Sequence, residues 1–253
     1  AVSEARLEKV SGRVVEVVGT LAEAEIPGAV VGGLCKIGND TLCEVVGFRD
    51  RRALLMPLES LTGVSFGSKV STVEGSIKVH VGDELIGRIV DGLGQPMDGG
   101  PSLRGLEQRR VEGKALDPLA RTLIDDPLET GIRVLDGMLT VGKGQRIAVM
   151  SGSGVGKSTL MGMLARNVKA DVNVICLVGE RGREVREFIE KDLGPEGLAR
   201  SIMVVVTSDR SPVLQVKGAF VAAAIAEHFR DQGKDVLMMM DSLTRFAMAQ
   251  RQI

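Results

Sequence analysis

The chain has 253 residues, of which 44% are hydrophobic and 26% charged, enough for one large domain or two modest ones with a buried core. Its formal net charge is −1, and it contains six Phe but neither Trp nor Tyr, which argues against a nucleic-acid surface built on charge or base stacking. It has no signal-peptide pattern and no run near the ~20 apolar residues that span a bilayer, so we expect a cytoplasmic protein.

From about residue 11 to residue 74, short alternating apolar runs are separated by turn residues at a spacing near ten. This pattern predicts a small closed or nearly closed antiparallel β-barrel at residues 1–76, with an open sheet as the alternative, and residues 38–40 and 49–51 as turns. We expect a scaffold or assembly role for it. Cys35 and Cys43 could pair, but we expect them to be buried free thiols, like Cys176.

Residues 77–139 are rich in turn residues and form the first part of the second domain, which we place at 77–253. A short strand is predicted over Ile86–Val90, an irregular linker over Pro101–Pro127 and a helix over Thr130–Leu139. Gly92 and Gly94 lack the third glycine and the following helix of a dinucleotide-binding fingerprint, so we interpret them as a structural turn.

A predicted strand, Arg146–Met150, is followed by the glycine-rich loop Ser151–Gly156 and a helix that opens with Lys157. Strand, glycine loop and helix form a phosphate cradle, because backbone N–H groups and the helix N-terminus can face an anion. The pattern G-x-x-x-x-G-K-[ST] expects glycine where Ser151 stands, and the alternative is a turn that binds nothing. The expected nucleotide-binding residues are Ser151, Gly152, Ser153, Gly154, Val155, Gly156, Lys157, Ser158 and Thr159.

Strands and helices alternate after this loop, which predicts right-handed crossovers, a parallel sheet and ligands at the carboxyl ends of its strands. Ser211 and Pro212 are typical of a helix N-terminus, and a preceding helix is expected to close near Gly194. The predicted strands are Val172–Val178, Ile202–Val206 and Val236–Met240.

Two acids follow predicted strands of this sheet. Asp241 comes directly after VLMMM and could orient Mg²⁺ beside the Ser158 hydroxyl, while Lys157 reaches the β- and γ-phosphates. Glu180 also stands at a strand end, where a carboxylate could orient and deprotonate an attacking water. The alternative for Glu180 is a solvated charged turn in GERGRE.

Neighbouring arginines leave several readings open. Arg181 and Arg183 could pair with Glu184 or face the nucleotide, and Arg245 could form a salt bridge within the site or lie across a subunit boundary. Residue 1 is Ala, and RFAMAQRQI stops inside a helical pattern without a stop signal. We therefore expect that both ends are cut.

The segments IVDGLGQPMDG, SGSGVGKST, VGERGREVREFIE and MMMDSLTRFAMAQR together resemble the flagellar protein-export ATPases, a group of type III secretion ATPases related to rotary F- and V-type catalytic subunits. The resemblance runs from about Ser11 to the last residue. It implies a RecA-like P-loop domain after the barrel, in an α/β protein that forms a homo-hexamer. The implied function is Mg-ATP hydrolysis that feeds unfolded export substrates to a membrane gate, peripherally at the inner membrane.

The resemblance also implies roles for single residues. Lys157 binds phosphates, Ser158 and Asp241 serve Mg²⁺, Glu180 is the catalytic carboxylate, and Arg181 beside it has a positioning role. The family's arginine finger, its C-terminal helical domain and the segment that binds the export regulator and stator lie outside this chain or are short. Because such a finger is worth ~10³–10⁵ in rate, we expect binding of Mg-ATP but poor turnover by this chain alone.

Three further readings stay open at this stage. An injectisome type III secretion ATPase would show the same motifs, with chaperone–substrate complexes as partners in either system. A non-catalytic nucleotide-binding assembly subunit is disfavoured by Glu180, which such a subunit has no need to keep. A nucleic-acid translocase is disfavoured by the near-neutral charge and the scarcity of aromatic residues.

Overall fold

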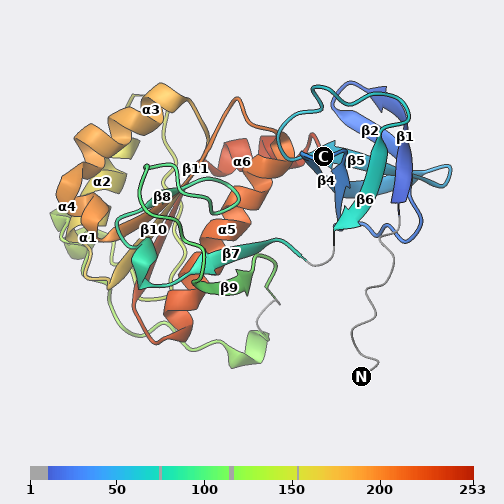
Figure 1. Cartoon of the computed structure of the whole chain (residues 1–253). Coiled ribbons are helices and arrows are strands. Elements are labelled where there is room, and N and C mark those ends of the chain that lie inside the picture. The colour runs from blue at the N-terminus through green and yellow to red at the C-terminus, as the bar shows by residue number, and fades with distance from the viewer. Residues whose placement is uncertain (1–10, 74–75, 114–116, 153) are drawn as a thin grey trace.

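The computed structural model describes residues 11–73, 76–113, 117–152 and 154–253. A β-barrel, blue to cyan in Figure 1, lies beside a larger part in which helices pack on both faces of a sheet. This arrangement confirms the predicted fold class, an antiparallel barrel followed by a mainly parallel α/β part. The boundary at residue 76 stays a prediction.

Six antiparallel strands close the barrel in the order β1-β2-β5-β4-β3-β6, which decides against an open sheet. Residues 38–40 form the predicted turn between β3 and β4. Asp50 and Arg51 form the two-residue turn between β4 and β5, and both have the positive φ that a tight hairpin requires. The strands are β1 (Ser11–Val18), β2 (Leu21–Glu25), β3 (Leu34–Ile37), β4 (Thr41–Arg49), β5 (Arg52–Pro57) and β6 (Lys69–Val73).

Small and branched apolar side chains fill the barrel. Cys35 and Cys43 lie directly opposite each other on β3 and β4, and both are buried in this core. All three cysteines are free and buried, as predicted. Burial raises the pKa of the Cys43 thiol to about 12, so these thiols act as small apolar side chains.

The α/β part is built on a four-stranded parallel sheet in the order β12-β10-β11-β8, with β7 and β9 paired beside it. Its strands are β7 (Lys78–Val81), β8 (Ile89–Val90), β9 (Glu107–Arg110), β10 (Val172–Glu180), β11 (Ser201–Thr207) and β12 (Val236–Asp241). Its helices are η1 (Asp83–Leu85), η2 (Pro118–Ala120), α1 (Arg133–Met138), α2 (Lys157–Asn167), α3 (Gly182–Glu187), η3 (Phe188–Leu193), α4 (Gly194–Ala199), α5 (Pro212–Asp231) and α6 (Leu243–Gln250).

The central strand β10 is buried on both faces, as its nearly continuous apolar sequence predicts. Its side chains alternate between two cores. Val174 and Cys176 pack with α5 on one face, whereas Ile175 and Leu177 pack with α2 and the α3–α4 region on the other. Helices on both faces therefore leave the strand ends as the part of the sheet open to a ligand.

The predicted strand at 146–150 is wrong. These residues are exposed and carry no ladder pairing among the described residues, and Met150 is 89% exposed. An apolar run gives a segment the preference for a strand, but a strand exists only through its hydrogen-bonded neighbour.

Other predictions differ from the structure in extent. Of the strand predicted over Ile86–Val90, only Ile89–Val90 forms a strand, β8. Within the expected linker 101–127, β9 pairs with β7. The helix expected to close near Gly194 continues through a π-helical segment, η3, into α4. Pro195 stands in the first turn of α4, where its missing N–H is not needed, so it begins a helical segment instead of ending one. Within the described residues, no helix combines the length and apolar character that a membrane crossing demands.

Candidate nucleotide site

The two acids predicted from the sequence lie at the same edge of the sheet. Asp241, the last residue of β12, stands opposite Leu177 of β10, and Glu180 ends β10 three residues further on. Glu180 in turn lies opposite Thr207 at the end of β11. Parallel pairing therefore gathers these side chains where the carboxyl ends of neighbouring strands meet.

The glycine-rich loop enters α2 through residues that only glycine adopts easily. Gly154 has φ +75° and Gly156, the N-cap of α2, has φ +97°. The space around the missing Cβ atoms of Gly152, Gly154 and Gly156 is open. The loop therefore presents bare backbone next to the N–H groups of a helix start, the chemistry that favours an anion. Ser153 lies outside the described residues.

Lys157, at the start of α2, forms an ion pair with Asp241. Asp241 is nearly buried, while a third of the Lys157 side chain is exposed. Ser158 and Thr159 follow in the first turn of α2 and are exposed. The loop lysine and the strand-end carboxylate, 84 residues apart in the chain, therefore contact each other.

Glu180 is held by Arg245 of α6. The Arg245 Nε donates to Glu180 Oε1 at 3.0 Å and Nη2 approaches Oε2 at 3.5 Å, so the guanidinium faces both oxygens of the carboxylate. Of the two readings for Arg245, the salt bridge within the site is the one seen in this chain. Burial raises the pKa of Glu180, the neighbouring Glu184 carboxyl raises it further, and Arg245 lowers it.

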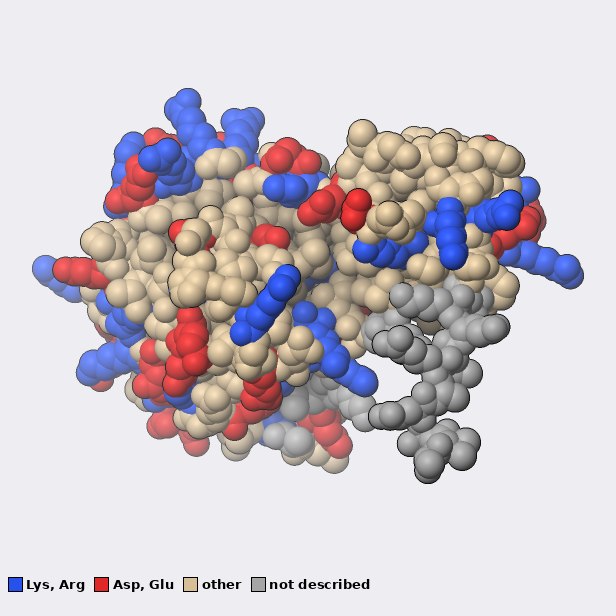
Figure 2. All heavy atoms as spheres, in the orientation of Figure 1, with Lys and Arg blue, Asp and Glu red and all other residues tan. Residues whose placement is uncertain are grey.

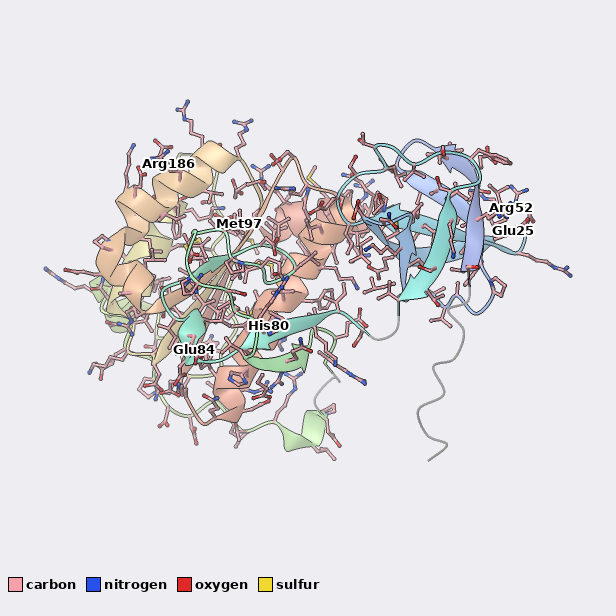
Figure 3. The ribbon with its side chains drawn as sticks, in the orientation of Figure 1. Glu25, Arg52, His80, Glu84, Met97 and Arg186 are labelled. Atoms are coloured by element: carbon pink, nitrogen blue, oxygen red, sulfur yellow. The ribbon has the colours of Figure 1, made fainter. Side chains whose placement is uncertain are left out.

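The charged segment after Glu180 forms α3 and its N-cap, Arg181, and most of its side chains are exposed. Arg181 pairs with Glu184 at 3.5 Å, with both side chains largely exposed, which is one of the two predicted arrangements. Arg186 bonds Glu190 at 2.7 Å, and Figure 3 labels it at α3, in the part of the molecule far from the barrel. Figure 2 shows Lys, Arg, Asp and Glu side chains interspersed over this region, so neither sign dominates that face.

Gly179 is a site residue that sequence reasoning missed. It has φ +71° at a bulge in β10, and a Cβ there would stand 2.9 Å from both Cβ and Cδ of Arg245. The same Cβ would lie 3.1 Å from Gln215 Oε1 of α5. Because the position has no side chain, Arg245 can pack against the strand and reach Glu180. The glycine directly before the acid was the available signal.

Comparison with known proteins identifies the class. Residues 131–253 match the ATP synthase alpha/beta family, nucleotide-binding domain, and residues 8–73 match the beta-barrel domain of the same family. The two matches cover the barrel, the glycine-rich loop and both strand-end acids. The chain belongs to the ATP synthase alpha/beta family.

Within this family, the chain is similar to ATPases of flagella and type III secretion. It is 50% identical over 248 residues to the flagellum-specific ATP synthase of Bacillus subtilis, covering 96% of this chain and 57% of that protein. It is also 50% identical over 247 residues to the type 3 secretion system ATPase of Xanthomonas euvesicatoria, covering 96% and 56%.

A solved structure shares the fold. The ATPase EscN, in complex with its central stalk EscO from the enteropathogenic E. coli type III secretion system, matches with a TM-score of 0.88 and 44% identity. That match covers 95% of this chain and 60% of the EscN chain. The chain thus spans a little over half the length of the relatives it matches.

Proposed function

We propose that the protein binds Mg-ATP and hydrolyses it as the motor of a flagellar type III protein export apparatus. The observation that carries the proposal is the contact between Lys157 and Asp241, with Glu180 at the neighbouring strand end. A phosphate-binding cation, a metal-binding acid and a water-orienting acid are the groups that phosphoryl transfer to water needs.

Phosphate binding is assigned to the loop and the first turn of α2. Backbone N–H groups of the glycine-rich loop and the start of α2 are proposed to bind the phosphates, and Lys157 to contact the β- and γ-phosphates. Thr159, in the same exposed turn, completes the proposed nucleotide-binding set. Lys157 stabilises negative charge that develops on the γ-phosphate oxygens.

Mg²⁺ fits the oxygen donors at this edge. The Ser158 hydroxyl and the Asp241 carboxylate are the proposed protein ligands, and the ion would neutralise charge on the phosphates. Among the described residues, no group of three or more His, Cys, Asp or Glu side chains could hold a metal ion. Mg²⁺ usually binds one or two carboxylates together with phosphates and waters, so the proposed ion would enter with its nucleotide.

Glu180 is proposed to orient the attacking water and to accept its proton. Its partly buried position favours this role, since burial and Glu184 raise its pKa toward the range where a carboxylate accepts a proton more readily. Arg181, which follows Glu180 and is exposed, is proposed as a positioning residue whose partner Glu184 neighbours the acid.

The biological setting rests on the relatives. Flagellum-specific names predominate among the similar proteins, which favours the flagellar apparatus, and the Xanthomonas euvesicatoria protein and EscN make an injectisome the second candidate. We propose a homo-hexamer in the cytoplasm, peripheral to the inner-membrane export gate, with an export regulator or stator and chaperone–substrate complexes as partners. Restoration of swimming in a strain lacking its flagellar ATPase would support the flagellar assignment, and restored secretion without motility would favour an injectisome.

Two substitutions in the full-length protein test the site. Lys157→Ala should abolish ATP binding measured by calorimetry, whereas Lys169→Ala, which removes an exposed lysine of the same domain, should not change it. Glu180→Gln should keep binding but lose hydrolysis, and Glu187→Gln on the exposed side of α3 should keep both. A Glu180→Gln protein that turns over ATP at the parental rate would remove the catalytic assignment and favour a non-catalytic subunit.

A further inference from the structure

The barrel is fastened to α5 by a buried ion pair. Lys217 of α5 donates to Glu44 of β4 at 3.0 Å and to Glu112 at 2.8 Å. Only 8% of the Lys217 side chain and 13% of the Glu44 side chain are exposed, so these charges depend on each other instead of on water. Burial raises the pKa of Glu44, and Lys217 opposes that rise.

Two further contacts hold the same end of α5 against the barrel. The Ser211 hydroxyl caps α5 by accepting from Leu214 N, and it donates to the Leu58 carbonyl at 2.5 Å. Val213 is buried in an apolar cluster with Met56 and Leu58. These polar and apolar contacts with the barrel therefore come from seven residues, 211–217, which form the N-cap and the first turns of α5.

The same turns of α5 also reach the candidate site. Gln215 Oε1 lies 3.1 Å from the position where a Cβ of Gly179 would stand, directly before Glu180. Further along α5, Phe220 packs edge-on against Phe246 of α6, with ring centroids 6.4 Å apart, and α6 carries Arg245. Because a packed helix moves as a rigid element, a shift of α5 changes the positions of Glu180 and Arg245 together.

We propose that Lys217 is a positioning residue for the proposed hydrolysis: by holding the barrel on α5, it fixes the end of β10 and the Glu180–Arg245 pair. The expected effect on the rate rests on the proposed function. The expected effect on the position of Glu180 and Arg245 does not depend on hydrolysis. Among the residues that the structure describes, Lys217 forms ion pairs with Glu44 and Glu112 and none with the strand-end acids, so its proposed effect runs through α5.

The test uses the full-length protein with Lys217→Met and with the double variant Glu44→Leu and Lys217→Met. The single variant leaves Glu44 buried without its cation, whereas the double variant replaces the pair by apolar groups, which is often neutral for stability. Lys169→Met, which removes a lysine whose pair with Glu129 is exposed, is the matched control. Hydrogen–deuterium exchange at residues 178–181 and the kcat and KM for ATP are measured for each.

We expect Lys217→Met to speed exchange at residues 178–181 and to lower kcat by roughly ten- to a hundredfold with little change in KM, since a displacement near 1 Å can cost that much. The double variant should return kcat to within about threefold of the parent, because the barrel is again seated. A folded Lys217→Met protein with parental exchange and kcat overturns the inference, as does a double variant as impaired as the single one.

A second variant and a readout that needs no hydrolysis separate the possible outcomes. If Lys217→Met does not fold, Glu44→Gln keeps the shape of the pair and should show the same changes in smaller size, and unchanged exchange and kcat in that variant overturn the inference. The exchange measurement requires no hydrolysis. An active Glu180→Gln protein would thus refute the catalytic assignment, while unchanged exchange in Lys217→Met would refute only the role of Lys217.

Discussion

The close packing at Gly179 predicts that Gly179→Ala destabilises the protein and disturbs the candidate site. A left-handed backbone costs an L-residue about 1–2 kcal/mol. The new methyl group would also stand 2.9 Å from Arg245 Cβ, which can retreat only if α6 moves, and overpacking of this kind costs about 1–3 kcal/mol. The free energy of unfolding should therefore fall by about 2–5 kcal/mol.

Urea unfolding followed by circular dichroism measures this loss. With a slope of about 3 kcal/mol per molar urea, the midpoint should fall by roughly 0.7–1.7 M. Gly182→Ala is the control, because Gly182 has no positive φ, begins α3 and has open space at its Cβ position. Alanine should be neutral there or stabilise α3 by up to about 1 kcal/mol.

The urea midpoints of the Gly179→Ala and Gly182→Ala proteins test whether the contact with Arg245 constrains position 179. If Gly179→Ala and Gly182→Ala shift the midpoint equally, the contact between β10 and Arg245 does not constrain the site. A second readout concerns Glu180 itself. Because Arg245 lowers the pKa of Glu180, displacement of Arg245 by the new methyl group should raise that pKa. The acid limb of the pH profile of the proposed ATP hydrolysis should then move to higher pH.

The other predictions concern the pH dependence of stability and the cysteines. The Arg88 guanidinium, helped by backbone N–H groups, holds the pKa of Asp98 well below its usual range, so Asp98→Asn should lower the free energy of unfolding at pH 7. This loss should shrink as the pH falls below about 4, where the unfolded carboxyl takes up its proton, and urea titrations at pH 7 and pH 3 would contradict it if they gave equal losses. Burial raises the pKa of Cys35, and it raises that of Cys43 and Cys176 to about 12, so none of the three should react with a thiol reagent at pH 8 until urea unfolds the protein. Rapid labelling of the native protein would contradict this burial.

Much of the fold could be predicted because local signals and long-range pairing agreed. Alternating apolar runs with turn residues between them identified the barrel, and the β-rich run 172–178 identified a strand of the parallel sheet, which the structure places as the buried strand β10. The segment 146–150 carried an equally apolar pattern but is exposed and unpaired. Periodicity reports what a segment could bury, whereas the sheet order decides which segments find a neighbour.

The site could be predicted in outline for a topological reason. Carboxyl ends of parallel strands share one edge, so Glu180 and Asp241 had to lie near each other once the strands were assigned. The individual ion pairs could not be predicted in the same way. Lys157 and Asp241 are 84 residues apart, and the Lys217–Glu44 pair joins the barrel to α5, so each depends on how separate elements pack.

Arg245 shows where a local rule would have narrowed the choice between its two readings. Ser242 caps α6 by accepting from the Arg245 N–H, which fixes the first turn of the helix immediately after β12 ends at Asp241. A helix that starts there carries its third residue back over the strand ends, and the glycine at 179 leaves the space that Arg245 needs to reach Glu180. The cap, the missing side chain and the acid are all visible in the sequence, and it is their combination, not any one of them, that places the guanidinium inside the site.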